Sequence, residues 1–300
     1  MTPPLPSKIL SFLLIGCMGL VSGFTYDYYE RAVFTLPSSV TENRDRVAPK
    51  EISLDPNLLT ARAAVLIDPV TNTILFSKEG ETQLPLASLT KLATARAVLS
   101  SAQANTFVVI SEEDLKEEGD SGLHVGDVWR LVDLVAFGLT TSSNDAMAAA
   151  ASALSEGTAV SRMNYAARSE GLAQSYFLNP TGLDVSSSTA GAYGSALDVA
   201  RLVEILLREY PTIFEATVRW PQTPAESGKG AVSTTEPIWG LPGLIAAKTG
   251  FTDLAGGNLA VAVDLGLGEP VIAVVLGSTR ERRFDDIRLL VEEARKNLSL

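Results

Sequence analysis

Cysteine and histidine are almost absent from this sequence of 300 residues, which contains only Cys17 and His124. An intrachain disulfide needs two cysteines, and zinc or iron–sulfur centres need clusters of cysteine or histidine. The composition therefore excludes a disulfide framework and a multi-histidine metal centre. No motif points to a metal or any other cofactor.

Positive charge is also scarce. There are 24 Lys and Arg residues against 35 Asp and Glu residues, and the formal net charge is −11. Because affinity for a phosphate backbone comes mainly from Lys and Arg, we expect no nucleic-acid partner. Hydrophobic residues make up 46% of the chain, which is enough to form a core, and the length allows one large domain or two ordinary ones.

Long apolar runs are confined to the N-terminus, where residues 9–24 carry no charge and Tyr26, Tyr28 and Tyr29 follow at once. The run is short for a spanning helix, which needs ~20 residues, but the tyrosines are typical of a membrane–water boundary. An uncleaved signal anchor over residues 1–24 is the favoured interpretation. A cleaved signal peptide and lipid attachment at Cys17, within a lipobox-like segment, are the alternatives. All three predict that the rest of the protein is exported.

The remainder divides into a stalk and one globular domain. Residues 25–56 are charged, contain proline and lack apolar periodicity, which indicates a linker; residues 57–300 form the predicted domain. β-rich runs at 62–68 and 73–78, and at 259–265 and 271–276, predict two hairpins. Helices are predicted at 88–101, 130–138, 145–154, 160–169, 196–208 and 284–297. This order predicts an α+β fold, with helices on a mostly antiparallel sheet built from both ends of the domain.

A serine and a lysine stand three residues apart in Ser88-Leu89-Thr90-Lys91. On a helix this spacing places both side chains on one face, one turn apart. The positive end of the helix dipole favours an oxyanion there, and a neutral lysine amine can activate a serine hydroxyl by taking its proton. Taken alone, the pair is more typical of an N-cap serine followed by a solvated lysine.

A second motif, Ser142-Ser143-Asn144, precedes the helix predicted from residue 145. Serine and asparagine are common at helix starts, where they satisfy backbone N–H groups, and this is the structural interpretation. The functional interpretation gives Ser142 a role in proton relay and lets the Asn144 amide bind a peptide group of the substrate.

A third motif is Lys248-Thr249-Gly250, followed by Phe251. Its structural interpretation is a strand that ends in a glycine turn. Its functional interpretation is a carboxylate site, because an ammonium group and a hydroxyl group lie side by side on a strand. Glycine leaves the strand face open to the backbone of a ligand.

Each motif occurs once, and in this order they form the signature of penicillin-binding proteins and class A β-lactamases. Further similar segments lie at residues 85–87, 122–127, 179–183, 193–200, 276–277 and 283–286. The chain thus resembles the D-alanyl-D-alanine carboxypeptidase family, the low-molecular-mass penicillin-binding proteins. The resemblance implies a β-lactamase/DD-peptidase-like transpeptidase fold, with an all-helical subdomain beside the sheet.

The resemblance also implies a catalytic set. Ser88 would attack the carbonyl between two D-alanines, Lys91 would accept its proton, and Ser142 would help to pass that proton to the leaving amine. The backbone N–H groups of Ser88 and Phe251 would form the oxyanion hole. The reaction requires neutral Lys91, a form that burial and the positive charge of Lys248 would favour.

Substrate binding is implied for Asn144, Lys248, Thr249, Gly250 and Phe251. Lys248 and Thr249 would hold the terminal carboxylate, and Asn144 would bind a peptide amide. Many family members carry a polar residue or histidine in place of Phe251, so its ring is expected to reshape the pocket. No metal or cofactor is implied.

Other functions compete with the carboxypeptidase. A D,D-endopeptidase that cuts cross-links would use the same serine chemistry. A class A β-lactamase needs a deacylating glutamate in a Glu-x-x-Leu-Asn setting, and the sequence after Glu170 does not match. A silent penicillin-binding module would not need both Ser88 and Lys91. His124, in a glycine-flanked turn, is expected to have a structural or surface role.

Export and a cell-wall substrate together predict an extracytoplasmic enzyme of the bacterial cell envelope. The favoured form is attached to the membrane through its N-terminal segment, and the alternative is secretion after signal cleavage. The expected partners are the stem peptides of peptidoglycan, with β-lactams as covalent inhibitors.

Overall fold

The computed structural model describes residues 51–101, 106–116, 118, 122–154, 158–218, 233–266 and 268–298. All of them belong to the compact unit Leu36–Leu300. The predicted anchor, Cys17 and the stalk up to residue 50 lie outside the described residues, so those predictions stay open. Among the described helices, none combines the length and the apolar character that crossing a membrane requires.

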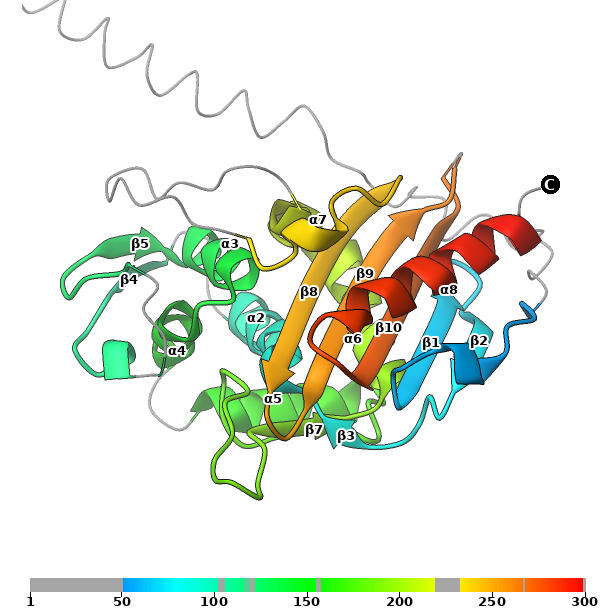
Figure 1. Ribbon diagram of the computed structural model, residues 1–300. Helices are drawn as coiled ribbons and strands as arrows, with labels where there is room; N and C mark the ends of the chain where they lie inside the picture. The colour runs from blue at the N-terminus through cyan, green and yellow to red at the C-terminus, as the bar shows by residue number, and fades with distance from the viewer. Residues whose placement is uncertain are drawn as a thin grey trace, which may run out of the picture. The chain divides into compact units, whose positions relative to one another are not determined.

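An antiparallel sheet of five strands, in the order β2-β1-β10-β9-β8, forms the centre of the fold (Figure 1). Its strands are β1 (Ala63–Asp68), β2 (Thr73–Lys78), β8 (Leu244–Thr252), β9 (Gly256–Asp264) and β10 (Pro270–Ser278). Both predicted hairpins are confirmed, because β1 pairs with β2 and β9 pairs with β10. β1 also pairs with β10, so the two ends of the domain share one sheet, as predicted.

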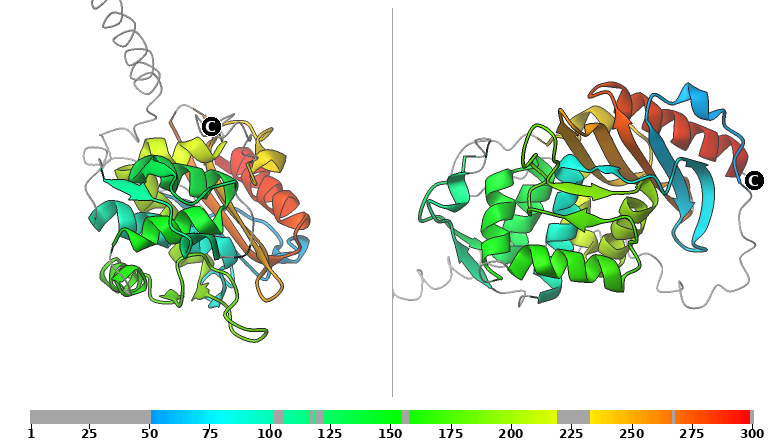
Figure 2. Two further views of the ribbon diagram at one scale, coloured as in Figure 1. Left: turned by 90° about the vertical axis from the view of Figure 1, so that its left-hand side faces the viewer. Right: turned by 90° about the horizontal axis from the view of Figure 1, so that it is seen from below.

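Both faces of this sheet are covered, and the strands are therefore apolar at successive positions. Ala63, Val65 and Ile67 of β1 belong to the core on one face, whereas Ala64 and Leu66 belong to the core on the other. Helix α6 (Ala196–Glu209) contributes to the first core and α8 (Arg282–Leu298) to the second. In both views of Figure 2, α8 (red) lies against the face of the sheet that is turned away from the green helices.

The segment between β2 and β8 is mainly helical. Besides α6, its helices are α2 (Thr90–Ser101), α3 (Leu131–Thr141), α4 (Asn144–Ser152), α5 (Thr158–Ser169) and the short α7 (Pro211–Glu215). The six predicted helices are all confirmed, with ends displaced by a few residues. This part also carries the ribbon formed by β4 (Phe107–Val109) and β5 (Val128–Arg130), which the prediction of an all-helical subdomain did not include.

The start of the first helix differs from the prediction. Residues Ala87–Leu89 form a 3-10 turn, η3, and the α-helix begins only at Thr90. Ala87 has φ +49°, a left-handed conformation that a residue with a Cβ seldom adopts. A second small sheet, of β3 (Leu84–Pro85), β7 (Ala192–Gly194) and β6 (Tyr176–Phe177), lies just before this turn. Strands this short have no periodicity by which a sequence could reveal them.

The ends of the domain are joined by one buried carboxylate. Asp286 on α8 accepts hydrogen bonds from the backbone N–H groups of Thr60 and Ala61, at 2.9 and 3.0 Å, and from Ser278 Oγ at 2.6 Å. Ile52, within the predicted stalk, is also buried and donates its N–H to the Leu75 carbonyl at 2.8 Å. Ordered structure therefore reaches back at least to this residue.

Candidate active site

Ser88 and Lys91 meet at the junction between η3 and α2. Lys91 has no exposed surface, and its Nζ lies 2.8 Å from Ser88 Oγ. The predicted placement of the two side chains one turn apart is confirmed. The alternative of a solvated lysine is wrong, because Lys91 is enclosed by protein.

Two further oxygen atoms hold the Lys91 amine in place. The Asn144 side-chain oxygen lies 2.7 Å from Nζ, and the Thr181 carbonyl lies 2.8 Å from it. These partners come from α4 and from the loop before β7, so three distant parts of the chain fix the nitrogen next to the serine. The contact with Ser88 is of the kind that permits proton transfer between nucleophile and base.

The second motif divides its tasks among three adjacent residues. Ser143 is the N-cap of α4 and accepts the Ala146 N–H at 3.0 Å. Ser142 ends α3 with φ +61°, and its hydroxyl points to Lys248. The Asn144 side chain bridges Lys91 Nζ and the Glu118 carbonyl. The structural interpretation thus holds for Ser143 alone, and its neighbours belong to the site.

The third motif lies on the edge strand β8. Lys248 is fully buried, and its Nζ donates to Ser142 Oγ and to the Thr249 carbonyl, each at 2.9 Å. Burial lowers the pKa of Lys248 well below its usual value, and the charges of Lys91 and Arg283 lower it further. The strand continues to Thr252, so the alternative of a turn directly after Gly250 is wrong.

Gly250 allows β8 to approach the turn that carries the nucleophile. A Cβ at this position would lie 2.9 Å from the Leu86 carbonyl oxygen and 3.2 Å from the backbone nitrogen of Ser88. Any side chain at residue 250 would therefore push the two elements apart. The glycine of the motif is needed for this close packing as well as for ligand access.

The motifs line one pocket of about 380 Å³. Predicted residues in its wall are Ser88, Ser142, Thr249, Gly250 and Phe251. The other residues of the wall were not predicted from the sequence: Ser233, Thr234, Glu236, Pro237, Arg280 and Arg283. Thr249 donates its hydroxyl hydrogen to Thr234 Oγ1 at 2.7 Å, which orients the motif's hydroxyl. No local pattern marks these residues, because they reach the pocket only through the tertiary fold.

Two arginines add positive charge beside the third motif. Arg283 is buried and donates to the Gly250 carbonyl at 2.7 Å; burial and the nearby Arg280 lower its pKa to about 10. The Arg280 guanidinium lies 5.0 Å from the centre of the Phe251 ring, within the range of a cation–π contact. A pocket with these cations and a small, open strand face is suited to an anionic peptide end.

The loop of residues 179–182 packs next to the nucleophile turn and holds one of the partners of Lys91. Asn179 Oδ1 accepts the Gly182 N–H at 2.7 Å, and Thr94 Oγ1 donates to the Pro180 carbonyl at 2.6 Å. These bonds present the Thr181 carbonyl to Lys91. This segment resembles the family in sequence, but no site residue was predicted in it.

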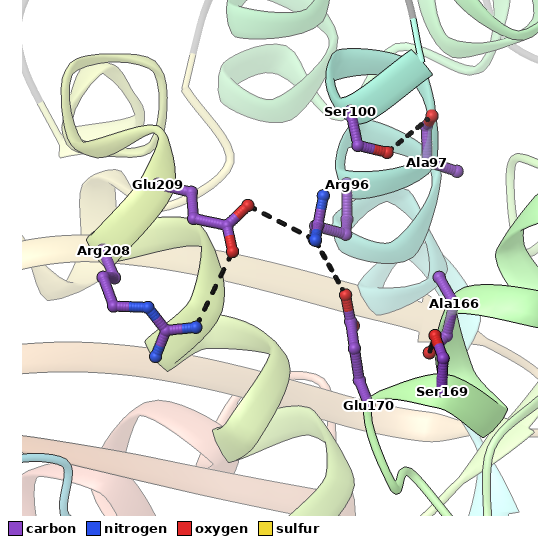
Figure 3. Close-up of polar contacts among 8 residues, drawn as sticks. All are labelled: Arg96, Ala97, Ser100, Ala166, Ser169, Glu170, Arg208 and Glu209. Atoms are coloured by element: carbon purple, nitrogen blue, oxygen red, sulfur yellow. Dashed lines mark hydrogen bonds and ion pairs between the residues drawn. The ribbon is translucent and has the colours of Figure 1, made fainter.

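Two other residues weighed in the sequence lie apart from the pocket wall. His124 is 64% exposed and lies 3.7 Å from Asp127. Glu170 contacts Arg96 at 2.9 Å, and Arg96 also contacts Glu209 (Figure 3). Burial raises the pKa of Glu170, and Arg96 partly offsets this. Within the described ranges, no group of three or more His, Cys, Asp or Glu residues could hold a metal ion.

Fold and site together define a serine peptidase of the penicillin-binding class, with a Ser–Lys pair facing a cationic edge strand. The chain belongs to the D-alanyl-D-alanine carboxypeptidase family of peptidases (S11), whose profile matches residues 50–280.

Relatives and solved structures agree with this assignment. The chain is 27% identical to the D-alanyl-D-alanine carboxypeptidase DacF of Bacillus subtilis over 94% of this chain and 70% of that protein. It is 29% identical to a D-alanyl-D-alanine endopeptidase of Pseudomonas aeruginosa, covering 73% and 71% of the two chains. The cefotaxime-bound penicillin-binding protein D2 of Listeria monocytogenes superposes with a TM-score of 0.70 at 28% identity, over 80% of this chain and 99% of that one. The predicted family and fold class are confirmed.

Substitution of Gly182 tests how tightly the lysine-holding loop packs on the nucleophile turn. Gly182 has φ +81°, and a Cβ there would lie 1.9 Å from the Ala87 carbonyl oxygen. Gly171 has φ +73° but no atom within 4 Å of its Cβ position, so it is a matched control. Gly171→Ala should lose about 1–2 kcal/mol from backbone strain alone.

Gly182→Ala should lose at least about 2 kcal/mol more in urea unfolding, and its Ser88 should react more slowly with a fluorescent penicillin. Equal losses of stability and equal reactivity in the two variants would show that the close packing of Gly182 on Ala87 contributes neither to stability nor to the position of Ser88.

Proposed function

We propose that this protein is a serine-type D-Ala-D-Ala carboxypeptidase that trims peptidoglycan stem peptides through an acyl-enzyme on Ser88. The observation that carries the proposal is the 2.8 Å contact between Lys91 Nζ and Ser88 Oγ. This pair faces a pocket that Thr249 also lines, with Lys248 next to Ser142 behind it. The proposed nucleophile, base and carboxylate site thus lie next to one another, which supports cleavage before a free carboxyl terminus.

In the acylation step, Ser88 Oγ attacks the carbonyl carbon of the penultimate D-alanine while its proton passes to neutral Lys91. The backbone N–H groups of Ser88 and Phe251 are proposed to hold the oxyanion; one such donor is typically worth about 3–4 kcal/mol. The C–N bond then breaks, and the terminal D-alanine leaves with a proton relayed from Lys91 through Ser142. Water hydrolyses the ester by the reverse proton path and restores Ser88.

Recognition of the substrate is proposed to use its free carboxylate. Thr249 would bind this group on the open edge of β8, where Gly250 leaves room for the peptide backbone, and the charge of Lys248 would attract it from just behind the pocket wall. Asn144 is already hydrogen-bonded to Lys91 through its oxygen, so its amide nitrogen is the atom offered to a substrate carbonyl. That nitrogen now donates to the Glu118 carbonyl, which a substrate group would replace.

A D,D-endopeptidase is the second candidate, because two curated relatives bear that name, at 29% and 25% identity. A β-lactamase is disfavoured, since Glu170 is engaged with Arg96 and does not line the pocket. A silent binding module is disfavoured by the intact Ser88–Lys91 contact. Because a structure of similar fold has cefotaxime bound, we also propose that β-lactams acylate Ser88.

Release of D-alanine from a cell-wall pentapeptide tests the proposed reaction. The full-length protein in detergent should release D-alanine, and Ser88→Ala should lower the rate by at least about 10⁴-fold, because the nucleophile is removed. Ser100→Ala is the control, since this exposed serine lies near the end of α2 and does not line the pocket, and it should keep the parental rate.

Mass analysis of the products distinguishes the candidate enzymes. Cleavage of cross-linked dimers without D-alanine release from pentapeptide would replace the carboxypeptidase by the endopeptidase. If neither substrate is cleaved although penicillin still labels Ser88, the binding module would be supported instead.

The lowered pKa of Lys248 predicts a loss of carboxylate recognition at high pH. A protonated lysine attracts the carboxylate, so affinity is present below the lowered pKa and is lost as the pH rises through it, well before 10.5. The second-order rate of acylation by benzylpenicillin should therefore fall on the alkaline side. Its methyl ester should react slowly at every pH and lack this decline; a parallel decline for acid and ester would contradict the assignment.

We further propose that residues 1–24 form an uncleaved signal anchor and that the stalk predicted over residues 25–56 ends before Ile52, which packs on the domain; this would place the catalytic domain on the outer side of the cytoplasmic membrane. The apolar run, the adjoining tyrosines and the family's action on the cell wall support this. The expressed full-length chain should stay with membranes through salt and alkaline washing, whereas a chain starting at residue 25 and carrying a cleavable export signal should be released. Recovery of both in the soluble fraction would contradict the anchor.

A further inference from the structure

Asn258 is a polar residue near the start of β9, the strand next to the edge strand β8, and it is completely buried. It lies on β9 directly opposite Gly250 of β8. Burial of an amide is costly unless its donors and acceptor are satisfied. Its partners therefore show what this side chain holds together.

The Asn258 amide joins the sheet to the segment that enters the nucleophile turn. Its Nδ2 donates to the carbonyl oxygens of Pro85 at 3.0 Å and Leu86 at 3.1 Å. Its Oδ1 accepts the N–H of Gly277 at 2.8 Å. Gly277 has φ +67° and lies where the pairing of β10 with β9 shifts register, so this bond also satisfies a backbone donor at the irregularity.

The turn that Asn258 holds is a strained one. Ala87 follows Leu86 and has φ +49°, which costs about 1–2 kcal/mol for a residue with a Cβ. Such a conformation persists only when the surroundings enforce it. The two carbonyl groups that Asn258 binds immediately precede Ala87, so the amide fixes the backbone at the point where it must turn.

The same bonds set the spacing between the turn and β8. The Leu86 carbonyl oxygen and the Ser88 nitrogen lie 2.9 and 3.2 Å from the position of a Cβ on Gly250. The proposed oxyanion hole takes one N–H from each of these elements, Ser88 from the turn and Phe251 from β8. The relative position of its two halves depends on what ties the turn to the sheet.

We propose that Asn258 is a positioning residue that aligns the two halves of the oxyanion hole by tying the Pro85–Leu86 backbone to β9. This inference rests on the proposed function, since it assigns Asn258 to the acyl-transfer step. Asn258 does not touch the pocket and acts only through the turn that carries Ser88.

The test compares Asn258→Ala with a matched asparagine that lies away from the pocket wall. Asn164 on α5 also binds two carbonyl groups, of Val160 and Phe177, and accepts the Phe177 N–H. Asn164→Ala thus removes the same set of bonds. Both variants should unfold at lower urea concentrations than the parent, Asn258→Ala the more so because Asn258 is fully buried and Asn164 half-buried. Asn258→Ala alone should lose about 10–100-fold in kcat with KM changed less than about 3-fold.

The carbonyl stretch of the acyl-enzyme formed with a β-lactam reports on the oxyanion hole directly. Misaligned donors polarise the ester less, so the band of Asn258→Ala should move to higher frequency, whereas that of Asn164→Ala should match the parent. Rates are expressed per active site, and active sites are counted by labelling with a fluorescent penicillin. If Asn258→Ala does not fold, Asn258→Ser is measured in the same way and should give the same shift in smaller degree.

The outcomes distinguish the proposed function from the positioning role of Asn258. Failure of the parent protein to form an acyl-enzyme would overturn the proposed function. An acylating parent together with an Asn258 variant that keeps the parental kcat and carbonyl band would leave the function intact and overturn the positioning role.

Discussion

Two lysine side chains that have been completely removed from water govern the architecture of this site. Transferring an ammonium group into a protein interior is strongly unfavourable, and here Lys91 and Lys248 are close enough for the charge of one to act on the other. Hydroxyl, amide and carbonyl oxygens from separate segments surround their nitrogen atoms. The surrounding fold must therefore be rigid, because a small displacement would leave a buried amine without these contacts.

The sheet and the helical part supply that rigidity in different ways. Lys248 extends from the edge strand β8, and most residues of β8 and of its partner β9 are buried. The backbone at Lys248 therefore has little freedom. Lys91 belongs to a helix that is held at its start by a strained turn and farther along by Thr94 and the 179–182 loop. Ser143 caps α4 by accepting a backbone N–H of its first turn. The side chains of Ser142 and Asn144 are therefore not needed for capping and contact the two lysines instead. Structural and chemical duties are divided between adjacent residues.

The sequence predicts the elements and the motif residues well, because both depend on local patterns. The three-residue spacing of Ser88 and Lys91 already implies contact on a helix, and β-branched runs around a glycine turn imply the β9–β10 hairpin. Contacts that depend on tertiary packing are different. The Thr181 carbonyl and Arg283 reach the site, and Asn258 reaches the turn that carries Ser88, only through the tertiary fold, and no local pattern gave these residues a role in the site. The conformation of Ala87 could not be predicted either, since alanine has no preference for a left-handed backbone.

The pairing of β1 with β10 has a consequence for when the molecule can form. β1 lies between β2 and β10, so the first hairpin has no second neighbour until residues 270–278 are available. Contacts so distant in sequence slow folding and leave incomplete chains without a closed core. If the domain is exported as proposed, the part that has already crossed the membrane could not complete this sheet until residues 270–278 had followed it.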